Sequence, residues 1–344
     1  IILGTEIKNE NEVIIDGQYI GLLKGMRLEL DLKSGYLKTD IKSLRKAARQ
    51  AIVPELMRRA NKIMKSDELQ LSDDNKIYWM DYPIASISPG KSYLDPKLEL
   101  LIDEATDNET KEKLKKNLEE KLMAIIKKDL VDLVSLGQLK YENSYARALC
   151  YQLLENNGVI KRESVEQIVK NINKEDRIKL KKAGVKIGRY HVFLPRMLKP
   201  NAVSLRIKLW KLFFPEDKKY IITQSGLNFL INENKKDKKF LLICGFENFG
   251  DFYIRVDILE RFFLKVIDNT KNKIFKTNSD MINLIGSSKE NFYKLLELMH
   301  YKRKIIKGNK EDFFIYQPRF KKNKVQSIVK KPSNDNPFKK LSEI

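Results

Sequence analysis

The chain has 344 residues, of which 42% are hydrophobic, and its 67 Lys and Arg against 46 Asp and Glu give a formal net charge of +21. This length predicts two or three domains with cores of their own, and the charge favours nucleic acid or an anionic membrane surface as partner. No apolar run approaches the roughly 18 residues of a membrane span, and the two cysteines and two histidines are too few for the usual zinc site. We therefore expect a cytoplasmic protein without membrane contact, metal or disulfide framework.

Residues 1–106 are predicted to form a small α+β domain. Alternation of period two gives an antiparallel meander with strands at 12–15, 18–23 and 26–31, and further strands at 69–71, 76–79 and 84–88. Between them a helix runs from Asp40 to about Lys65, with a solvated cationic face that includes Arg59, and Pro54 is expected to kink or restart it. Because the chain begins with Ile1-Ile2-Leu3, we expect it to be the C-terminal piece of a longer protein.

Residues 107–215 are predicted to be a helical domain. Apolar periodicity indicates a long helix or a close pair over 111–136, and a further helix over 144–156. Capping boxes at Ser164 and Asn173 begin two more helices, and Gly184 ends the last of them. From Asp107 to Gly184 we expect an all-α bundle of four or five helices. A short strand is expected at Arg189–Leu194, and the segment 203–214 fits a helix better than a strand.

The last part of this domain is strongly basic. Residues 177–211, which we term the basic band, hold eleven Lys or Arg and no Asp or Glu, with aromatic rings interleaved. Such a combination suits a polyanion, because cations displace counterions from phosphates and rings stack on unpaired bases. The alternative is a basic surface over a core that buries the rings. The nucleic-acid-binding candidates are Lys181, Lys182, Lys186, Arg189, Tyr190, Phe193, Arg196, Lys199, Arg206, Lys208 and Lys211.

The C-terminal part reads as a linker over 216–243, a winged-helix-like domain over 244–318 and a disordered basic tail over 319–344. The domain is predicted from a strand at 252–256, helices at 257–268, 279–285 and 288–299, and a hairpin of 302–306 with 312–317. Its recognition helix would carry Lys289, Asn291, Tyr293 and Lys294, and its wing tip Lys307 and Lys310. Winged helices also dock proteins, and that role stays open here.

The expected fold class is therefore α+β and mostly helical. It combines small antiparallel β elements at the N-terminal end, a central helical bundle and a C-terminal winged-helix-like unit.

One segment imitates a nucleotide site. Residues 85–92 read A-x-x-x-x-G-K-S, and the apolar run 100–104 ends in paired acids. However, Pro96 would fall inside the helix that a P-loop opens, and the two strands are too close for a crossover, which needs about a dozen or more residues. We expect a turn at Pro89-Gly90 instead, with no catalytic residue, nucleotide or other cofactor in this chain.

Several blocks resemble one family. GLLKGMR at 21–27 is similar to its G-x-L-x-G-F-x-F segment, and IYW at 77–79 with IA at 84–85 and PG at 89–90 is similar to W-x-G-x-x-(I/V)-A. GVKIGR at 184–189, with FLP at 193–195 and LKP at 198–200, resembles G-V-R-F-G…L-P-x-L-L-K-P, and RVDILER at 255–261 resembles R-I-D-M-L-E-R. The family comprises bacterial superfamily 2 helicase-like proteins related to the ATP-dependent RNA helicase of the mitochondrial degradosome. Met26 replaces an aromatic residue, and Lys186 and Ile187 replace Arg and Phe.

The resemblance implies a parent with two RecA-like domains upstream of Ile1, which would bind ATP and Mg²⁺. This chain would be its accessory region, with RNA or single-stranded nucleic acid, the RecA-like domains and a nuclease as partners, and would not hydrolyse ATP by itself. Two alternatives stay open: a scaffold that docks a helicase to a nuclease, and a self-sufficient P-loop ATPase. RNA and DNA are not separated by these residues.

Overall fold

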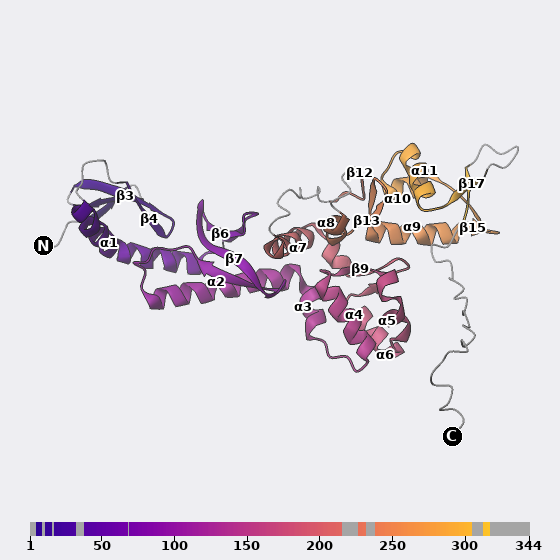
Figure 1. Ribbon diagram of the computed structural model, residues 1–344, viewed down its shortest axis with the longest axis horizontal. Helices are drawn as coiled ribbons and strands as arrows, with labels where there is room; N and C mark the ends of the chain where they lie inside the picture. The colour runs from indigo at the N-terminus through magenta and orange to yellow at the C-terminus, as the bar shows by residue number, and fades with distance from the viewer. Residues whose placement is uncertain are drawn as a thin grey trace, which may run out of the picture. The chain divides into compact units, whose positions relative to one another are not determined.

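The structure is a computed structural model that describes residues 5–8, 11–15, 17–31, 38–67, 69–214, 226–231, 238–304 and 312–316. The fold is α+β, with many helices and several small antiparallel sheets (Figure 1). Contacts divide it into a larger unit, Ile1–Phe263 with Leu284–Gly286, and a smaller unit, Leu264–Asn283 with Ser287–Ile344.

The larger unit begins with a four-stranded antiparallel sheet, which comprises β1 (Thr5–Lys8), β2 (Glu12–Ile15), β3 (Gln18–Lys24) and β4 (Arg27–Leu30). Helix α1 (Lys38–Lys65) contacts β2 and is continuous through Pro54, so the expected restart does not occur. Arg59 is buried rather than solvated, because its guanidinium donates to the carbonyl oxygens of Leu23 at 3.0 Å and Gly25 at 2.7 Å. This arginine therefore ties the helix to the β3–β4 turn.

A second antiparallel sheet follows, made of β5 (Leu69–Leu71), β6 (Lys76–Trp79), β7 (Tyr82–Ser92) and β8 (Asp95–Leu100) in that order. The expected turn at Pro89-Gly90 is wrong: β7 continues to Ser92, and its register against β8 shifts between Ser88 and Ser92. Strand β8 was not predicted as a separate strand. Helix α2 (Asn108–Asp129) packs on β8 and α1, with Asp107 as its N-cap.

The helical region contains α3 (Val131–Gln138), α4 (Ser144–Glu155), α5 (Glu166–Asn171), α6 (Lys174–Lys182) and α7 (Pro200–Phe213), with short 3₁₀ turns at Arg162–Val165 and Pro195–Leu198. The part expected to be all-α contains β9 (Val159–Lys161), which forms a sheet with β10 (Lys186–Ile187) and β11 (His191–Phe193) in the order β10-β11-β9. Strand β11 lies within the strand predicted at 189–194. Asn173 caps α6 as predicted, whereas the Ser164 hydroxyl donates to the Lys161 carbonyl and caps no helix.

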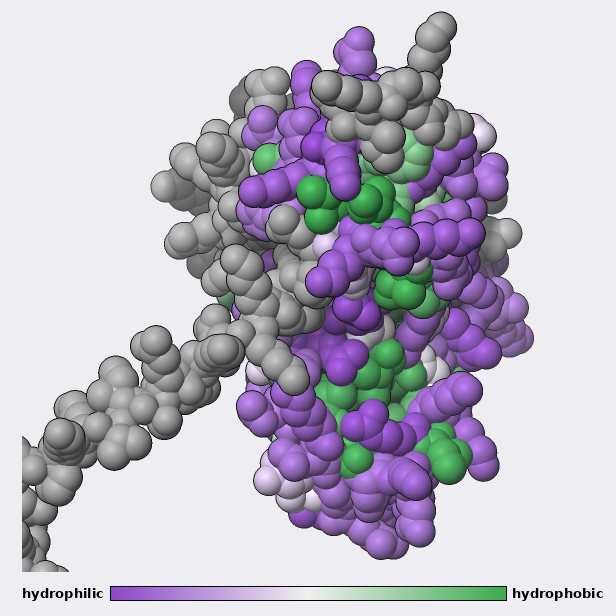
Figure 2. Space-filling view, turned by 90° about the vertical axis from the view of Figure 1, so that its right-hand side faces the viewer, coloured by the Kyte–Doolittle hydropathy of each residue, from purple (hydrophilic) through white to green (hydrophobic). Residues whose placement is uncertain are grey.

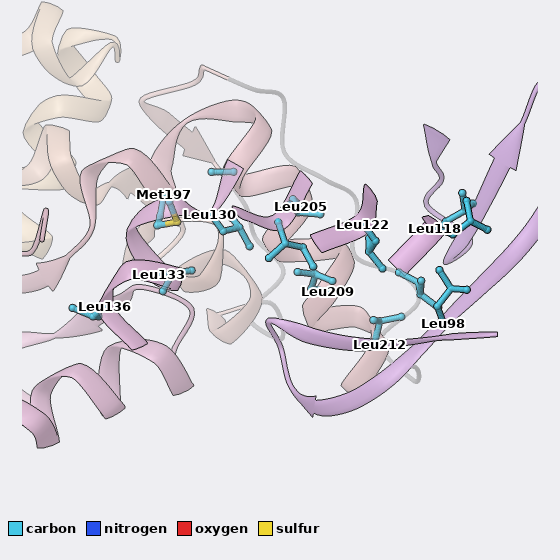
Figure 3. Close-up of a cluster of buried hydrophobic side chains, with 14 of the residues drawn as sticks. Leu98, Leu118, Leu122, Leu130, Leu133, Leu136, Met197, Leu205, Leu209 and Leu212 are labelled. Carbon is cyan, nitrogen blue, oxygen red and sulfur yellow. The ribbon is translucent and has the colours of Figure 1, made fainter. Parts of the chain in front are cut away.

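The main core joins these parts of the larger unit. Leucines of β8, α2, α3 and α7 meet Met197 in one continuous apolar cluster (Figure 3). The buried members of α2 and α3 recur at helical spacing, which explains why apolar periodicity found these helices. The pair separates at Leu130, which ends α2 and precedes α3.

The larger unit continues with β12 (Phe229–Ile231), α8 (Lys238–Ile243), β13 (Phe246–Phe249), β14 (Phe252–Arg255) and the first part of α9 (Val256–Asp268), whose residues from Leu264 onward belong to the smaller unit. The strands pair in the order β12-β14-β13. The linker expected over 216–243 is therefore wrong in part. Phe240 and Leu241 of α8 are buried with Trp210 and Cys244 in a second apolar cluster.

The smaller unit contains β15 (Thr270–Lys271), β16 (Ile274–Lys276), α10 (Ser279–Ile285) up to Asn283, α11 (Lys289–Leu298), β17 (Lys302–Lys304) and β18 (Phe313–Ile315). Its antiparallel sheet has the order β15-β16-β18-β17. The two helices and the β17–β18 pair were predicted, but β15 and β16 were not. The expected wing tip and the tail over 319–344 lie outside the described residues.

Candidate nucleic-acid interface

Part of the basic band is exposed to solvent. The exposed cations of segment 181–199 come from the end of α6, the β10–β11 hairpin and the turn before α7, and they are Lys181, Lys182, Lys186, Arg189, Arg196 and Lys199. Lys186 also lies over the edge of the core, with its Nζ 5.7 Å from the centroid of Phe193. We term these six residues the exposed cations, and no Asp or Glu occurs among residues 177–211.

One buried carboxylate brings the two ends of this segment together. A Cβ on Gly184, which follows α6, would lie 2.9 Å from Asp132 Oδ2, and the guanidinium of Arg196 lies 3.4 Å from Asp132 Oδ1. Burial raises the pKa of Asp132, and the charges of Arg196 and Lys199 oppose this rise without cancelling it. The end of α6 and the turn before α7 therefore meet around Asp132.

The rings of the basic band are inside the protein. Tyr190 is 4% exposed and stacks on Phe263 with ring centroids 3.6 Å apart, and Phe193 is fully buried beside Val159 and Val256. The expected stacking of Tyr190 and Phe193 on bases is wrong for this structure, because neither ring has a free face. Trp210 is also buried, in the cluster with Phe240. The rings therefore agree with the alternative interpretation, in which a basic surface covers a core that buries them.

Two predicted phosphate ligands have structural partners instead. Arg206 is fully buried, and its guanidinium donates to the carbonyl oxygens of Asn157 and Met197. The ammonium of Lys208 donates to the Leu71 carbonyl at 2.8 Å and lies 3.2 Å from Asp73. Arg206 therefore cannot meet a phosphate in this structure, and Lys208 joins α7 to the second sheet. Lys211 is half-buried.

The band is held in place by Glu260, whose role the sequence did not reveal. One oxygen of its carboxylate accepts the backbone N–H of Arg189 at 2.7 Å, and the other accepts those of Tyr190 at 2.8 Å and His191 at 3.0 Å. Gly188 is needed beside it, because a Cβ there would lie 2.5 Å from the Glu260 carboxyl carbon. This carboxylate on α9 is 4% exposed.

Next to Glu260 lies a buried network of charges. His191 Nε2 is 2.7 Å from Glu247 Oε2, and the ammonium of Lys161 is 2.8 Å from Glu247 Oε1. Burial opposes protonation of His191, but its contacts with Glu247 and Glu260 outweigh burial and raise the pKa of the imidazole. Burial likewise opposes ionisation of Glu247, but His191 and Lys161 lower its pKa to about 2. Glu247 is therefore ionised at neutral pH, and protonation of the buried His191 is favoured by its two carboxylate neighbours.

In the smaller unit, the predicted recognition helix is α11. Lys289 and Lys294 are exposed, whereas Asn291 is half-buried. Lys289 faces its own unit, with its Nζ 3.6 Å from Asp312 and 5.5 Å from the ring centroid of Tyr293. Asp312 also accepts from Tyr293 and Arg303, which lower its pKa and keep it ionised. Lys307 and Lys310 lie outside the described residues.

The nucleotide-like segment has no nucleotide-binding geometry. Lys91 lies in β7, which pairs antiparallel with β8, and a Cβ on Gly90 would lie 1.6 Å from the Asp95 carbonyl oxygen. A phosphate-binding loop needs a helix N-terminus after the lysine, and here a strand takes its place. Within the described ranges, no cluster of three or more His, Cys, Asp or Glu could hold a metal ion.

Hydrophilic side chains dominate the face shown in Figure 2, and apolar ones gather in small patches. None of the helices within the described ranges has the length and apolarity to cross a membrane.

Comparisons of the chain with protein-family models, curated proteins and solved structures found no match.

Proposed function

We propose that this chain is a nucleic-acid-binding accessory region of an ATP-dependent superfamily 2 helicase-like protein. It binds RNA or single-stranded nucleic acid through phosphates, and the RecA-like domains of the parent bind and turn over ATP. The observation that carries the proposal is the set of exposed cations between 181 and 199, in a band without carboxylates. Such a surface binds the sugar-phosphate backbone without reading sequence, since counterion release supplies the affinity.

The resemblance supports the parent in a second way. Two of the blocks that carry it, 184–189 and 255–261, are far apart in the sequence. Glu260 of the second block accepts the N–H of Arg189 in the first, and those of the next two residues. This contact places the two blocks in one local structure. Such an arrangement is expected if the chain kept both blocks from a common parent family.

The smaller unit is proposed to be a winged helix. Its helices α10 and α11 are followed by the paired strands β17 and β18, and β16 and β15 complete a four-stranded sheet with them. In that arrangement α11 is the recognition helix, with Lys289 and Lys294 as its exposed cations.

The test of phosphate binding is the salt dependence of affinity for a fluorescein-labelled oligouridylate. The triple variant Lys181→Ala/Lys182→Ala/Lys186→Ala should reduce the slope of log affinity against log salt by about 2, since each phosphate contact on a single strand contributes about 0.7. The matched control is Lys116→Ala/Lys127→Ala/Lys128→Ala on α2, which removes the same charge from exposed positions. Equal slopes in the two triple variants would contradict the proposal. A response to salt that is flat in the unaltered chain would favour a protein scaffold instead.

A further inference from the structure

The sheet of the smaller unit has two chemically different faces. Phe275 of β16 and Arg303 of β17 both lie opposite Phe314 of β18 in the strand register. The two rings are buried, and the Arg303 guanidinium lies 5.5 Å from the ring centroid of Tyr293 on α11. This row therefore marks the inner face of the sheet, which packs toward α11.

The opposite face is formed by the neighbouring rows, because successive residues of a strand point to opposite sides. In one row Phe313 lies between Lys276 and Lys304, and in the other Ile315 lies between Ile274 and Lys302. Lys271 of β15 is paired with Ile274 and extends the second row. The lysines are exposed and the three apolar side chains are half-buried. We term these residues the outer sheet face.

The charged residues of these strands are all positive. Strands β15, β16, β17 and β18 contain no Asp or Glu. The nearest acid along the chain, Asp312, is bound to Tyr293 and Arg303 on the inner side. Lysine stems can lie along apolar side chains while their ammonium groups stay in water, so the face offers flat apolar area between cations.

A ligand for this face must carry both negative charge and flat rings. Adjacent strands are about 4.8 Å apart, which places a lysine on each side of Phe313 within reach of a backbone whose base lies on the ring. An anionic membrane would satisfy the charge, but it would make no use of an aromatic ring in the centre of a lysine row. We infer that the outer sheet face is a second site for single-stranded nucleic acid, with Phe313 as a base-stacking platform and Lys276, Lys302 and Lys304 as phosphate ligands.

The test uses the full chain and two fluorescein-labelled probes of equal length, an oligouridylate and an abasic oligonucleotide. Phe313→Leu should weaken binding of the oligouridylate about tenfold and leave binding of the abasic strand unchanged, because only a ring stacks on a base. Phe313→Trp should restore the oligouridylate affinity. Lys302→Ala/Lys304→Ala should weaken binding of both probes, whereas Lys127→Ala/Lys128→Ala on α2 removes equal charge from the larger unit and should weaken neither. Circular dichroism and thermal melting of each variant would verify that it is folded.

The inference is overturned if Phe313→Leu folds and binds both probes as the unaltered chain does. It is also overturned if Lys302→Ala/Lys304→Ala lowers binding to vesicles that contain phosphatidylserine but not to oligouridylate. Photo-crosslinking gives a readout that does not depend on stability: the oligouridylate should crosslink to a peptide that contains Phe313, and an absent crosslink in the bound complex would refute the site. Failure here is distinct from failure of the proposed function, which the Lys181, Lys182 and Lys186 substitutions test in the larger unit.

Discussion

The basic band of the larger unit and the outer sheet face of the smaller unit contain the same kinds of residue and arrange them in opposite ways. In the band, Tyr190 and Phe193 are buried. Some of the cations are exposed to solvent, whereas Arg206 is buried and donates to backbone carbonyl oxygens. On the outer sheet face, Phe313 lies between two exposed lysines. The comparison shows that composition alone does not identify a binding surface. The side of the strand or helix on which each residue lies decides whether a ring belongs to the core or is available to a ligand.

The largest expected effect comes from removing the carboxylate that holds the band. Glu260→Ala should lower the free energy of unfolding of the larger unit by about 3–5 kcal/mol, because it leaves the backbone N–H groups of Arg189, Tyr190 and His191 without their acceptor and removes a carboxylate 3.8 Å from the His191 imidazole. Urea denaturation measures this change. Glu163→Ala, at an exposed position, is the control and should cost less than about 0.5 kcal/mol. Similar midpoints for both variants would show that Glu260 does not organise the band.

Arg206 separates a structural cation from a binding cation. Arg206→Met should lower the free energy of unfolding by about 2–4 kcal/mol, because two carbonyl groups in the core lose their donor. RNA affinity of the folded variant should not change. Lys199→Ala, at an exposed position, should show the opposite pattern, with weaker RNA binding and unchanged stability. A loss of affinity in folded Arg206→Met would return this residue to the binding surface.

The buried network predicts a specific dependence of stability on pH. The pKa of His191 is raised in the folded chain above its ordinary value of 6.5, so its stabilising effect is complete below pH 6.5 and is lost as pH rises through the folded pKa. The free energy of unfolding should fall by up to about 1.4 kcal/mol per pH unit in that window. Glu247 acts in the other direction, since its contribution is present above pH 4.5 and is lost as pH falls toward its pKa of about 2. Urea denaturation at several pH values measures both slopes.

Among variants of the network, His191→Gln should remove the decline above pH 6.5, and it should also weaken the loss on the acid side because His191 helps to lower the pKa of Glu247. A decline that persists in His191→Gln would assign the titration to another group.

The smallest expected effect comes from replacing one aromatic ring in each of the two regions. Phe193→Leu should lower the free energy of unfolding by about 1 kcal/mol, because a close-packed core loses contacts when a ring is replaced by a smaller side chain. It should leave RNA affinity unchanged, whereas Phe313→Leu should do the reverse. Thermal melting compares the stability of the two variants, and fluorescence anisotropy compares their RNA affinity. If Phe193→Leu also weakens RNA binding in the folded state, the core assignment of that ring is incomplete.

The sequence predicted those features that depend on local pattern. Helices such as α2, α4 and α11 follow from apolar spacing, and Asn173 begins α6 as expected. The caps at Asp107 and Asn143 were found in the structure. The short strands β9, β15 and β16 could not be found in this way, since two or three residues carry no period.

The arrangement of the band depended on partners far away in the sequence. Glu260 is 70 residues from Tyr190 and Arg206 is 49 residues from Asn157. No local pattern reports such pairs. One signal was present: Glu260 lies four residues after Val256 and three before Phe263, so it shares the apolar face of α9.

The two thiols offer a direct view of transient opening. Cys150 and Cys244 are both buried in the larger unit, and burial raises their pKa values to about 11 and about 12. A maleimide or disulfide reagent can therefore reach them only when the surrounding core separates, so its rate of reaction measures that separation. The sequence has no other cysteine, and the smaller unit contains none. A change in labelling rate when RNA binds would therefore report a change in the transient opening of the larger unit alone.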